Sequence, residues 1–162
     1  MYPAILRGNY QKVTMMASIR NNWKHETWNP VTGCSPVSEG CEHCYARGIA
    51  LKLKAMGVAK YRDGFSVAAH EDALGEPIHW RKPRLVFMTS MGDLFHPSVP
   101  DGFIQSVFDV IHRCDRHVFQ LLTKRPERMS EFSGRIPWPA NLWAGTTVEN
   151  RKVYHRLESL RR

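Results

Sequence analysis

The sequence predicts an α/β fold, in the form of an incomplete TIM-type β/α barrel with about four parallel β/α units. Strand-like and helix-like segments alternate along the chain, which is typical of a parallel sheet with right-handed crossovers. Residues 85–88 form a short continuous apolar run, as expected for a strand that is buried on both faces. The chain has 162 residues, and eight such units need about 250.

Four segments are expected to form the parallel strands: residues 18–32, 84–90, 118–122 and 142–148. In the first of these, Trp28 and Val31 can pack on a sheet, and Pro30 argues against a helix. Between the first two strands the chain is irregular, and Phe65 and Val67 are expected to form a further short strand there.

Four segments have the spacing of helices: residues 45–56, 100–114, 127–132 and 149–160. In the first helix, Ile49, Leu53 and Met56 recur at helical spacing and predict its apolar face. Cys114 ends the apolar pattern of the second helix and is expected to be a core residue.

The loop between the first strand and the first helix contains three of the four cysteines. Cys34, Cys41 and Cys44 fall within eleven residues, with the spacing C-x6-C-x2-C. Glycine and proline residues between them favour a loop, since proline fixes φ and glycine permits positive φ. A loop with three thiols can surround one metal centre.

Three interpretations of these thiols remain open. A structural zinc ion takes four protein ligands, so it would also need His43, His25 or a histidine distant in the sequence. A [4Fe–4S] cluster is usually held by four thiolates, so three would leave one iron free to bind another ligand. The third interpretation is buried unliganded cysteines, or a disulfide and one thiol, which is uncommon in a loop rich in glycine and proline.

Polar side chains follow the predicted strands where ligand groups gather in α/β folds. Ser90 and Asp93 follow the second strand, and Asp93 either accepts hydrogen bonds from a ligand or caps the next turn. Lys124 and Arg125 follow the third strand and either meet a carboxylate or phosphate or form a solvated basic loop. We expect Asp93, Lys124 and Thr147 to share one rim of the sheet with the cysteine loop.

The chain is basic, with a net charge of +8, which favours a polyanionic partner such as nucleic acid. It contains no run of 18 apolar residues, so no transmembrane helix is expected. The basic start is not followed by an apolar signal-peptide segment. These features predict a cytoplasmic protein without membrane contact, and reduced thiols in that compartment bind metals more often than they form disulfides.

Five stretches together carry a family resemblance: residues 28–34 (WNPVTGC), 40–47 (GCEHCYAR), 91–97 (MGDLFHP), 121–129 (LLTKRPERM) and 143–150 (WAGTTVEN). In this order they resemble an uncharacterised family of bacteriophage and prophage proteins. That family looks like a branch of the radical S-adenosylmethionine (radical SAM) enzymes, near the spore photoproduct lyase and DNA repair photolyase group. The usual radical SAM motif is C-x3-C-x2-C, so the first interval here is three residues longer.

The resemblance implies metal and cofactor sites. Cys34, Cys41 and Cys44 would hold three irons of a [4Fe–4S] cluster, and the fourth iron would bind S-adenosylmethionine and cleave it to a 5′-deoxyadenosyl radical. His43 stands before the third cysteine, where the superfamily usually has an aromatic residue, and would lie near the adenine. Ser90, Asp93 and Lys124 are the other expected cofactor-binding residues, the first two near the methionyl amine because the chain has no Gly-Gly-Glu-Pro stretch there. Nucleic acid is the candidate substrate.

The resemblance also divides the chain into an N-terminal extension, residues 1–17, and a partial barrel, residues 18–162. Because chains of this family run further, we expect the C-terminal half of the barrel to be missing, with an unpaired edge on the last strand. Such a chain would be inactive alone, and a second chain would complete the barrel. The alternatives are a zinc-binding nucleic-acid-binding module and an inactive prophage remnant.

Overall fold

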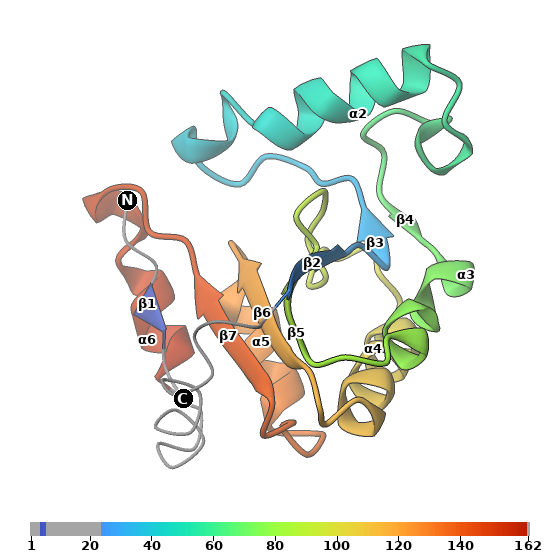
Figure 1. Cartoon of the computed structure of the whole chain (residues 1–162). Helices are drawn as coiled ribbons and strands as arrows, with labels where there is room; N and C mark the ends of the chain where they lie inside the picture. The colour runs from blue at the N-terminus through green and yellow to red at the C-terminus, as the bar shows by residue number, and fades with distance from the viewer. Residues whose placement is uncertain (1–3, 6–23, 162) are drawn as a thin grey trace.

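The computed structural model describes residues 4–5 and 24–161, and within them it shows an α/β fold with a four-stranded parallel sheet (Figure 1). The parallel strands are β2 (Lys24–Trp28), β5 (Arg84–Met88), β6 (Val118–Thr123) and β7 (Leu142–Thr146). They lie side by side in chain order, with β2 at one edge and β7 toward the other. This sequential order is that of a β/α barrel, so the predicted fold class, an incomplete barrel, is confirmed.

The described helices lie mainly in the crossovers between the strands. They are α2 (Tyr45–Ala55), α3 (Glu71–Leu74), α4 (Asp101–Arg113), α5 (Pro126–Ser133) and α6 (His155–Leu160). Short 3-10 helices are η1 (Glu39–Cys41), η2 (Ala59–Tyr61), η3 (Glu76–His79) and η4 (Arg151–Val153). The longest of these elements, α4, has 13 residues, and no helix in the described part of the chain has the length and apolarity needed to cross a membrane.

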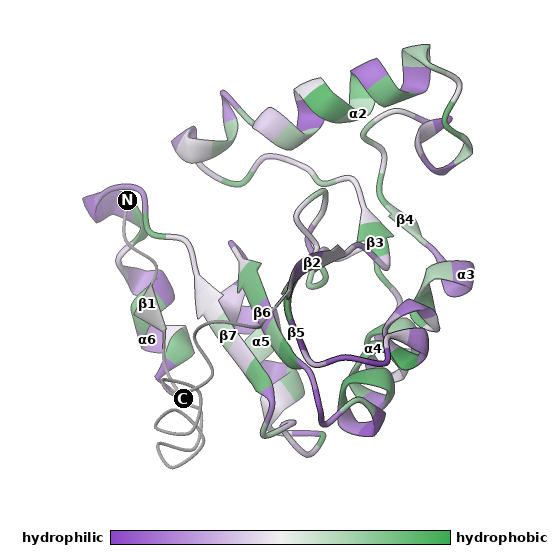
Figure 2. Ribbon diagram, in the orientation of Figure 1, coloured by the Kyte–Doolittle hydropathy of each residue, from purple (hydrophilic) through white to green (hydrophobic). Residues whose placement is uncertain are grey.

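The main core lies between the sheet and the helices on its outer face. Val86 and Met88 of β5 and Phe119 and Leu121 of β6 are at most 1% exposed and belong to one cluster with the buried side of α4. In α4 hydrophobic and hydrophilic residues alternate along the ribbon, as its amphipathic pattern predicts (Figure 2). Cys114, directly after α4, is 1% exposed, so the prediction of a core cysteine is confirmed.

The opposite face of the sheet is more open than the sequence predicts. Leu85 and Phe87 alternate with the buried residues of β5 and are only half-buried, as are Leu122 and Trp143 on β6 and β7. The prediction that residues 85–88 are buried on both faces is therefore wrong. The helices of a sequentially ordered barrel pack outside, and the apolar residues of the inner face line pockets instead.

The α2 segment lies away from the other helices and is reached through β3 (Val31–Thr32) and β4 (Ala68–Ala69), which pair antiparallel (Figure 1). The predicted strand at Phe65 and Val67 is therefore wrong by position, since the pairing begins at Ala68. Phe65 lies in a turn instead, and its carbonyl accepts from Cys34 N–H of the cysteine loop at 3.3 Å.

The helix α2 agrees with the predicted range, but its buried face differs. Ile49 is 41% exposed and Met56 75%, whereas Ala46 and Ala50 are buried, with Leu53 packed beside them. The small alanine side chains allow α2 to pack closely on Tyr61 and Met91. This close packing decides which face is buried, although the larger apolar residues have helical spacing on another face.

The C-terminal segment departs from the prediction at two places. The expected helix over residues 149–160 starts later and is divided into η4 and α6. The Asn150 side chain accepts from Lys152 N–H at 2.9 Å and caps the start of η4 at Arg151, and α6 begins only at His155. The edge of β7 is not unpaired, because β1 (Ala4–Ile5) pairs with it antiparallel, with Ala4 opposite Thr146. The rest of the predicted N-terminal extension lies outside the described residues.

Two glycines allow the start of the cysteine loop to cross the end of β5. Gly33 has a φ of +79° and donates its N–H to the Met91 carbonyl at 2.8 Å, and it bridges to Gly92. A Cβ on Gly33 would lie 2.1 Å from the Ser66 carbonyl oxygen. This crossing fixes where Cys34 emerges.

We expect Gly33→Ala to lower the free energy of unfolding by about 3 kcal/mol, because the left-handed φ and the close backbone approach are both incompatible with a side chain. Gly48→Ala is the matched control, since a Cβ there meets nothing within 4 Å and the residue lies inside α2. It should raise stability by up to about 1 kcal/mol. Urea denaturation measures both, and equal midpoints for the two variants would contradict the crossing.

Candidate functional site

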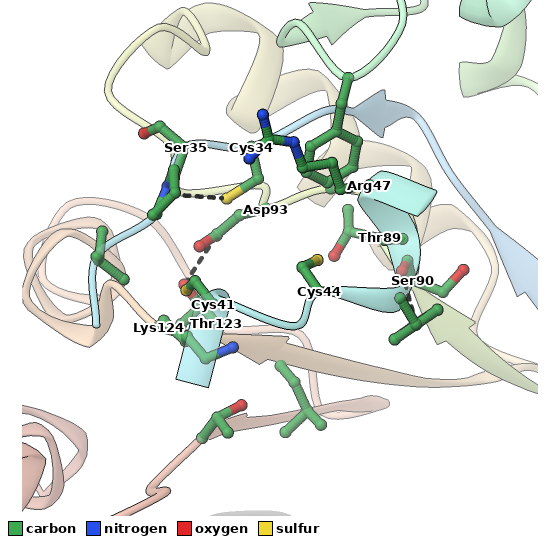
Figure 3. Close-up of a pocket in the computed structure, with 18 of the residues that line it drawn as sticks. Cys34, Ser35, Cys41, Cys44, Arg47, Thr89, Ser90, Asp93, Thr123 and Lys124 are labelled. Carbon is green, nitrogen blue, oxygen red and sulfur yellow. Dashed lines mark hydrogen bonds between the residues drawn. The ribbon is translucent and has the colours of Figure 1, made fainter. Parts of the chain in front are cut away.

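A pocket of about 550 Å³ opens at the carboxyl ends of the parallel strands, between the sheet, the cysteine loop and α2 (Figure 3). All three clustered cysteines line it. Asp93, Lys124 and Thr147 line the same pocket, each after a parallel strand. The prediction that these three residues share one rim with the cysteine loop is confirmed.

The three thiols are free and half-buried, and they do not form a disulfide. Among the residues that the structure describes, no three His, Cys, Asp or Glu side chains are grouped so that they could hold a metal ion. The thiols therefore share a pocket without forming a closed coordination site. Binding of one metal centre by all three requires a movement of the loop that carries them.

Cys34 is held by Arg125, which lies just beyond β6. The Arg125 guanidinium donates to Cys34 Sγ at 3.3 Å, to the Ser35 carbonyl at 3.0 Å and to Asp93 Oδ2 at 2.8 Å. The ion pair is mostly buried, with 11% of the Arg125 side chain and 6% of the Asp93 side chain exposed. One side chain thus joins the cysteine loop to the ends of two strands.

Asp93 accepts three hydrogen bonds from the protein. In addition to Arg125, its carboxylate accepts from Thr123 Oγ1 at 2.8 Å and from Phe95 N–H at 3.0 Å. The bond to Phe95 is the turn-capping role that the sequence offered as an alternative to a ligand contact. A direct contact between Asp93 and a ligand stays a prediction.

The thiols of Cys34 and Cys41 differ in acidity. Burial raises the pKa of Cys34, although Arg125 opposes this effect. At Cys41, partial burial is outweighed by hydrogen bonds from the backbone of Val37 and Ser38 and by the charge of Lys124, so its pKa is lowered. Of these two thiols, Cys41 therefore has the lower pKa.

The second half of the cysteine loop is held from the C-terminal segment. Ser38 donates its hydroxyl to Glu149, and Glu149 forms an ion pair with Arg156 at 2.8 Å. Only 6% of the Glu149 side chain and 3% of the Arg156 side chain are exposed. A Cβ on Gly40 would lie 2.9 Å from the Glu149 side chain, so glycine is required where the two segments meet.

The loop also carries a serine beside a histidine, a pair that could suggest nucleophilic catalysis. Ser35 Oγ lies 2.8 Å from His96 Nε2, but His96 Nδ1 accepts from Ser98 N–H at 3.1 Å. In the neutral ring the proton is then on Nε2, so His96 donates to Ser35 and is not a base for it. The pair strengthens the loop and does not activate the serine.

The remaining predicted site residues fall into two groups. Ser90 lines the pocket, where its hydroxyl donates to Asn29 Oδ1 at 3.2 Å. Lys124 also lines it and forms no ion pair with any residue that the structure describes. His43 is exposed and does not line the pocket, and neither does His25, which lies near the start of β2 rather than at its carboxyl end.

Sequence reasoning missed the Arg125–Asp93–Thr123 network and the Glu149–Arg156 pair. The first joins residues far apart in the chain, since Asp93 lies 32 positions from Arg125, and the second acts on the cysteine loop through Ser38, which lies 111 positions from Glu149. A motif of adjacent residues gives no signal for such pairs. The available hint was Arg125 directly after a buried strand, where a carboxylate partner was one expected outcome.

The fold and the site define the class of protein: an α/β partial barrel with a thiol-lined pocket at the carboxyl ends of its strands. Residues 18–162 match the family described as "Protein of unknown function (DUF5131)". Since the match covers most of the chain, the protein belongs to this family. No curated protein and no solved structure matches the chain.

We expect Asp93→Asn to lower the free energy of unfolding by about 3 kcal/mol, because it leaves the buried Arg125 charge without its partner. Asp63→Asn is the control, since its pair with Arg62 is exposed and should be worth about 0–1 kcal/mol. The double variant Asp93→Asn/Arg125→Met should recover part of the loss. Additive losses in a urea-denaturation cycle would show that the two side chains do not act as a pair.

Glu149 predicts a pH dependence of stability. Burial opposes its ionisation, but the Ser38 hydroxyl and Arg156 outweigh this and lower its pKa. A carboxyl with a lowered folded-state pKa stabilises above its unfolded pKa of about 4.3, and this contribution is lost as the pH falls through the folded value. Glu149→Gln should cost about 2 kcal/mol at pH 7, and the difference should shrink below about pH 4. Denaturation across pH measures it, and a constant difference would contradict the assignment.

Proposed function

We propose that this protein is an iron–sulfur, S-adenosylmethionine-dependent radical enzyme in which Cys34, Cys41 and Cys44 hold a [4Fe–4S] cluster. One observation carries the proposal. Three thiols from one loop line a single pocket at the carboxyl ends of parallel strands, which is where α/β enzymes gather their ligand groups. Cys114 is buried in the core, so it does not supply a fourth ligand at this pocket.

The donor set supports iron–sulfur over structural zinc. Thiolates are the usual ligands of iron–sulfur clusters, and three of them leave one coordination position open for a small ligand. Structural zinc takes four protein ligands, and no histidine, neither His43 nor His25 nor a more distant one, is among the described residues that line the pocket. A pocket of about 550 Å³ also suits a cofactor-sized molecule beside the thiols.

When bound, the cluster and S-adenosylmethionine would supply one-electron reduction and hydrogen abstraction. The chain itself contributes position and enclosure. Arg125 donates to Cys34 Sγ, and hydrogen bonds to thiolate sulfur are one of the means by which proteins tune iron–sulfur centres. Phe65, Phe87 and Leu122 provide apolar walls of the pocket, which limit the access of water to the reacting atoms.

Nucleic acid is the substrate class that we propose. The net charge of +8 favours a polyanion, and Arg47 and Lys124 bring positive charge to the pocket itself. The half-buried inner face of the sheet could be covered by a second chain that completes the barrel. We propose that the protein acts in the cytoplasm, where thiols stay reduced, and none of its four cysteines is paired in a disulfide.

Anaerobic reconstitution with ferrous iron and sulfide tests the metal centre. We expect a brown protein with about four irons and four sulfides per chain. Alanine at Cys34, Cys41 or Cys44 should remove most of the iron, whereas Cys114→Ala, the matched control, should retain it. With dithionite and S-adenosylmethionine, chromatography should detect at most slow formation of 5′-deoxyadenosine, because the four parallel strands do not close a barrel around the pocket. A colourless protein that retains one zinc would favour the zinc-binding module, and a protein that retains no metal would contradict both.

A further inference from the structure

Thr89, the residue that follows β5, combines two unusual properties. It is 4% exposed, and its Oγ1 is buried without a hydrogen-bond partner. Its φ is +50°, and no other described non-glycine residue has a positive φ. A β-branched residue rarely adopts this conformation, and a buried hydroxyl rarely lacks a partner. Thr89 lines the pocket, so this unpaired hydroxyl belongs to a residue that borders the space a ligand would occupy (Figure 3).

The first turn of α2 lies against the turn that contains Thr89. Tyr45 donates its phenolic hydroxyl to the Ser90 carbonyl at 2.7 Å, and Met91 packs in one cluster with Ala46. The helix is 11 residues long, and its N-cap residue, Cys44, makes no side-chain capping bond. The N–H groups of the first turn are therefore available to an acceptor from outside the helix.

The charges of the pocket also favour an acceptor. Among the described residues that line it, the acidic one is Asp93, and its carboxylate is paired with Arg125. The remaining charged residues of the lining are Arg47 and Lys124, and neither forms an ion pair with any described residue. The pocket thus presents hydrogen-bond donors and uncompensated positive charge, with no free carboxylate from that part of the chain.

We propose that Thr89, the first turn of α2 and Arg47 form a subsite for an anionic oxygen group, a phosphate or a carboxylate, of the molecule that occupies the pocket. The hydroxyl and the helix N–H groups would bind the oxygens directly, and Arg47 would supply charge. The inference uses only side chains and backbone of the metal-free chain, so it does not depend on the iron–sulfur proposal.

Isothermal titration calorimetry of the metal-free, reduced chain tests the subsite, with inorganic phosphate and acetate as probes. Binding of phosphate but not acetate identifies a phosphate group as the natural ligand group. Comparable binding of acetate identifies a carboxylate. Either affinity should fall as salt is added, because the attraction is largely electrostatic. If neither probe binds at low salt, the subsite does not exist.

Matched variants assign the binding to these residues. Thr89→Val keeps the shape and removes the hydroxyl, so the better probe should bind about tenfold more weakly, whereas Thr89→Ser should stay within about threefold of the original. Arg47→Gln should weaken binding several-fold, and Lys52→Gln, exposed on the same helix and outside the pocket, should not. Unchanged binding in both Thr89→Val and Arg47→Gln would overturn the proposal.

A further variant separates loss of binding from loss of folding. Thr89→Gly relieves the positive φ, so it should raise the melting temperature of the chain while it weakens binding as Thr89→Val does. A variant that is more stable and binds less cannot be explained by misfolding. A Thr89→Gly chain that binds the probe as well as the original would contradict the role of the hydroxyl.

Discussion

The ion pair between Arg125 and Asp93 is the interaction on which the pocket depends. It joins the end of β5, the end of β6 and the start of the cysteine loop through one guanidinium. Burial of two charges is costly unless hydrogen bonds satisfy their remaining groups. Thr123, Phe95 and Ser35 provide those bonds, so the pair is retained as part of a network rather than as an isolated contact.

The cysteine loop is anchored at two points by different parts of the barrel. Arg125 holds Cys34 and the next residue, and the Glu149–Arg156 pair holds the loop at Ser38. Cys41 lies just beyond the second anchor, as the last residue of η1. The separation of the three thiols therefore reflects where the two anchors place the loop. A metal that gathers them must compete with the Arg125 contact or keep it as a hydrogen bond to a bound sulfur.

Features set by local residue pattern, such as strand positions, were predicted correctly from the sequence. Features set by contacts between side chains distant in the sequence were not. The apolar run at residues 85–88 and the polar residues after it located β5 and the rim of the pocket correctly. The buried face of α2 was missed because it is formed by Ala46 and Ala50, whose small side chains allow close packing. The spacing of the larger apolar residues gives no sign of this face. The late start of the last helical segment was missed because Glu149, the expected first residue of the helix, is held by Ser38, which lies 111 positions away in the chain.

The same buried pair also sets the charge that a ligand meets. If Asp93 were unpaired, the pocket would offer a carboxylate to a cation such as an ammonium group. Because Arg125 neutralises that carboxylate, the remaining groups are donors: the Thr89 hydroxyl, the first turn of α2 and the side chains of Arg47 and Lys124. The overall charge of +8 would not by itself select a ligand, but charge placed on the wall of a pocket does. A structural contact at one end of the pocket thereby determines its preference for anionic groups at the other.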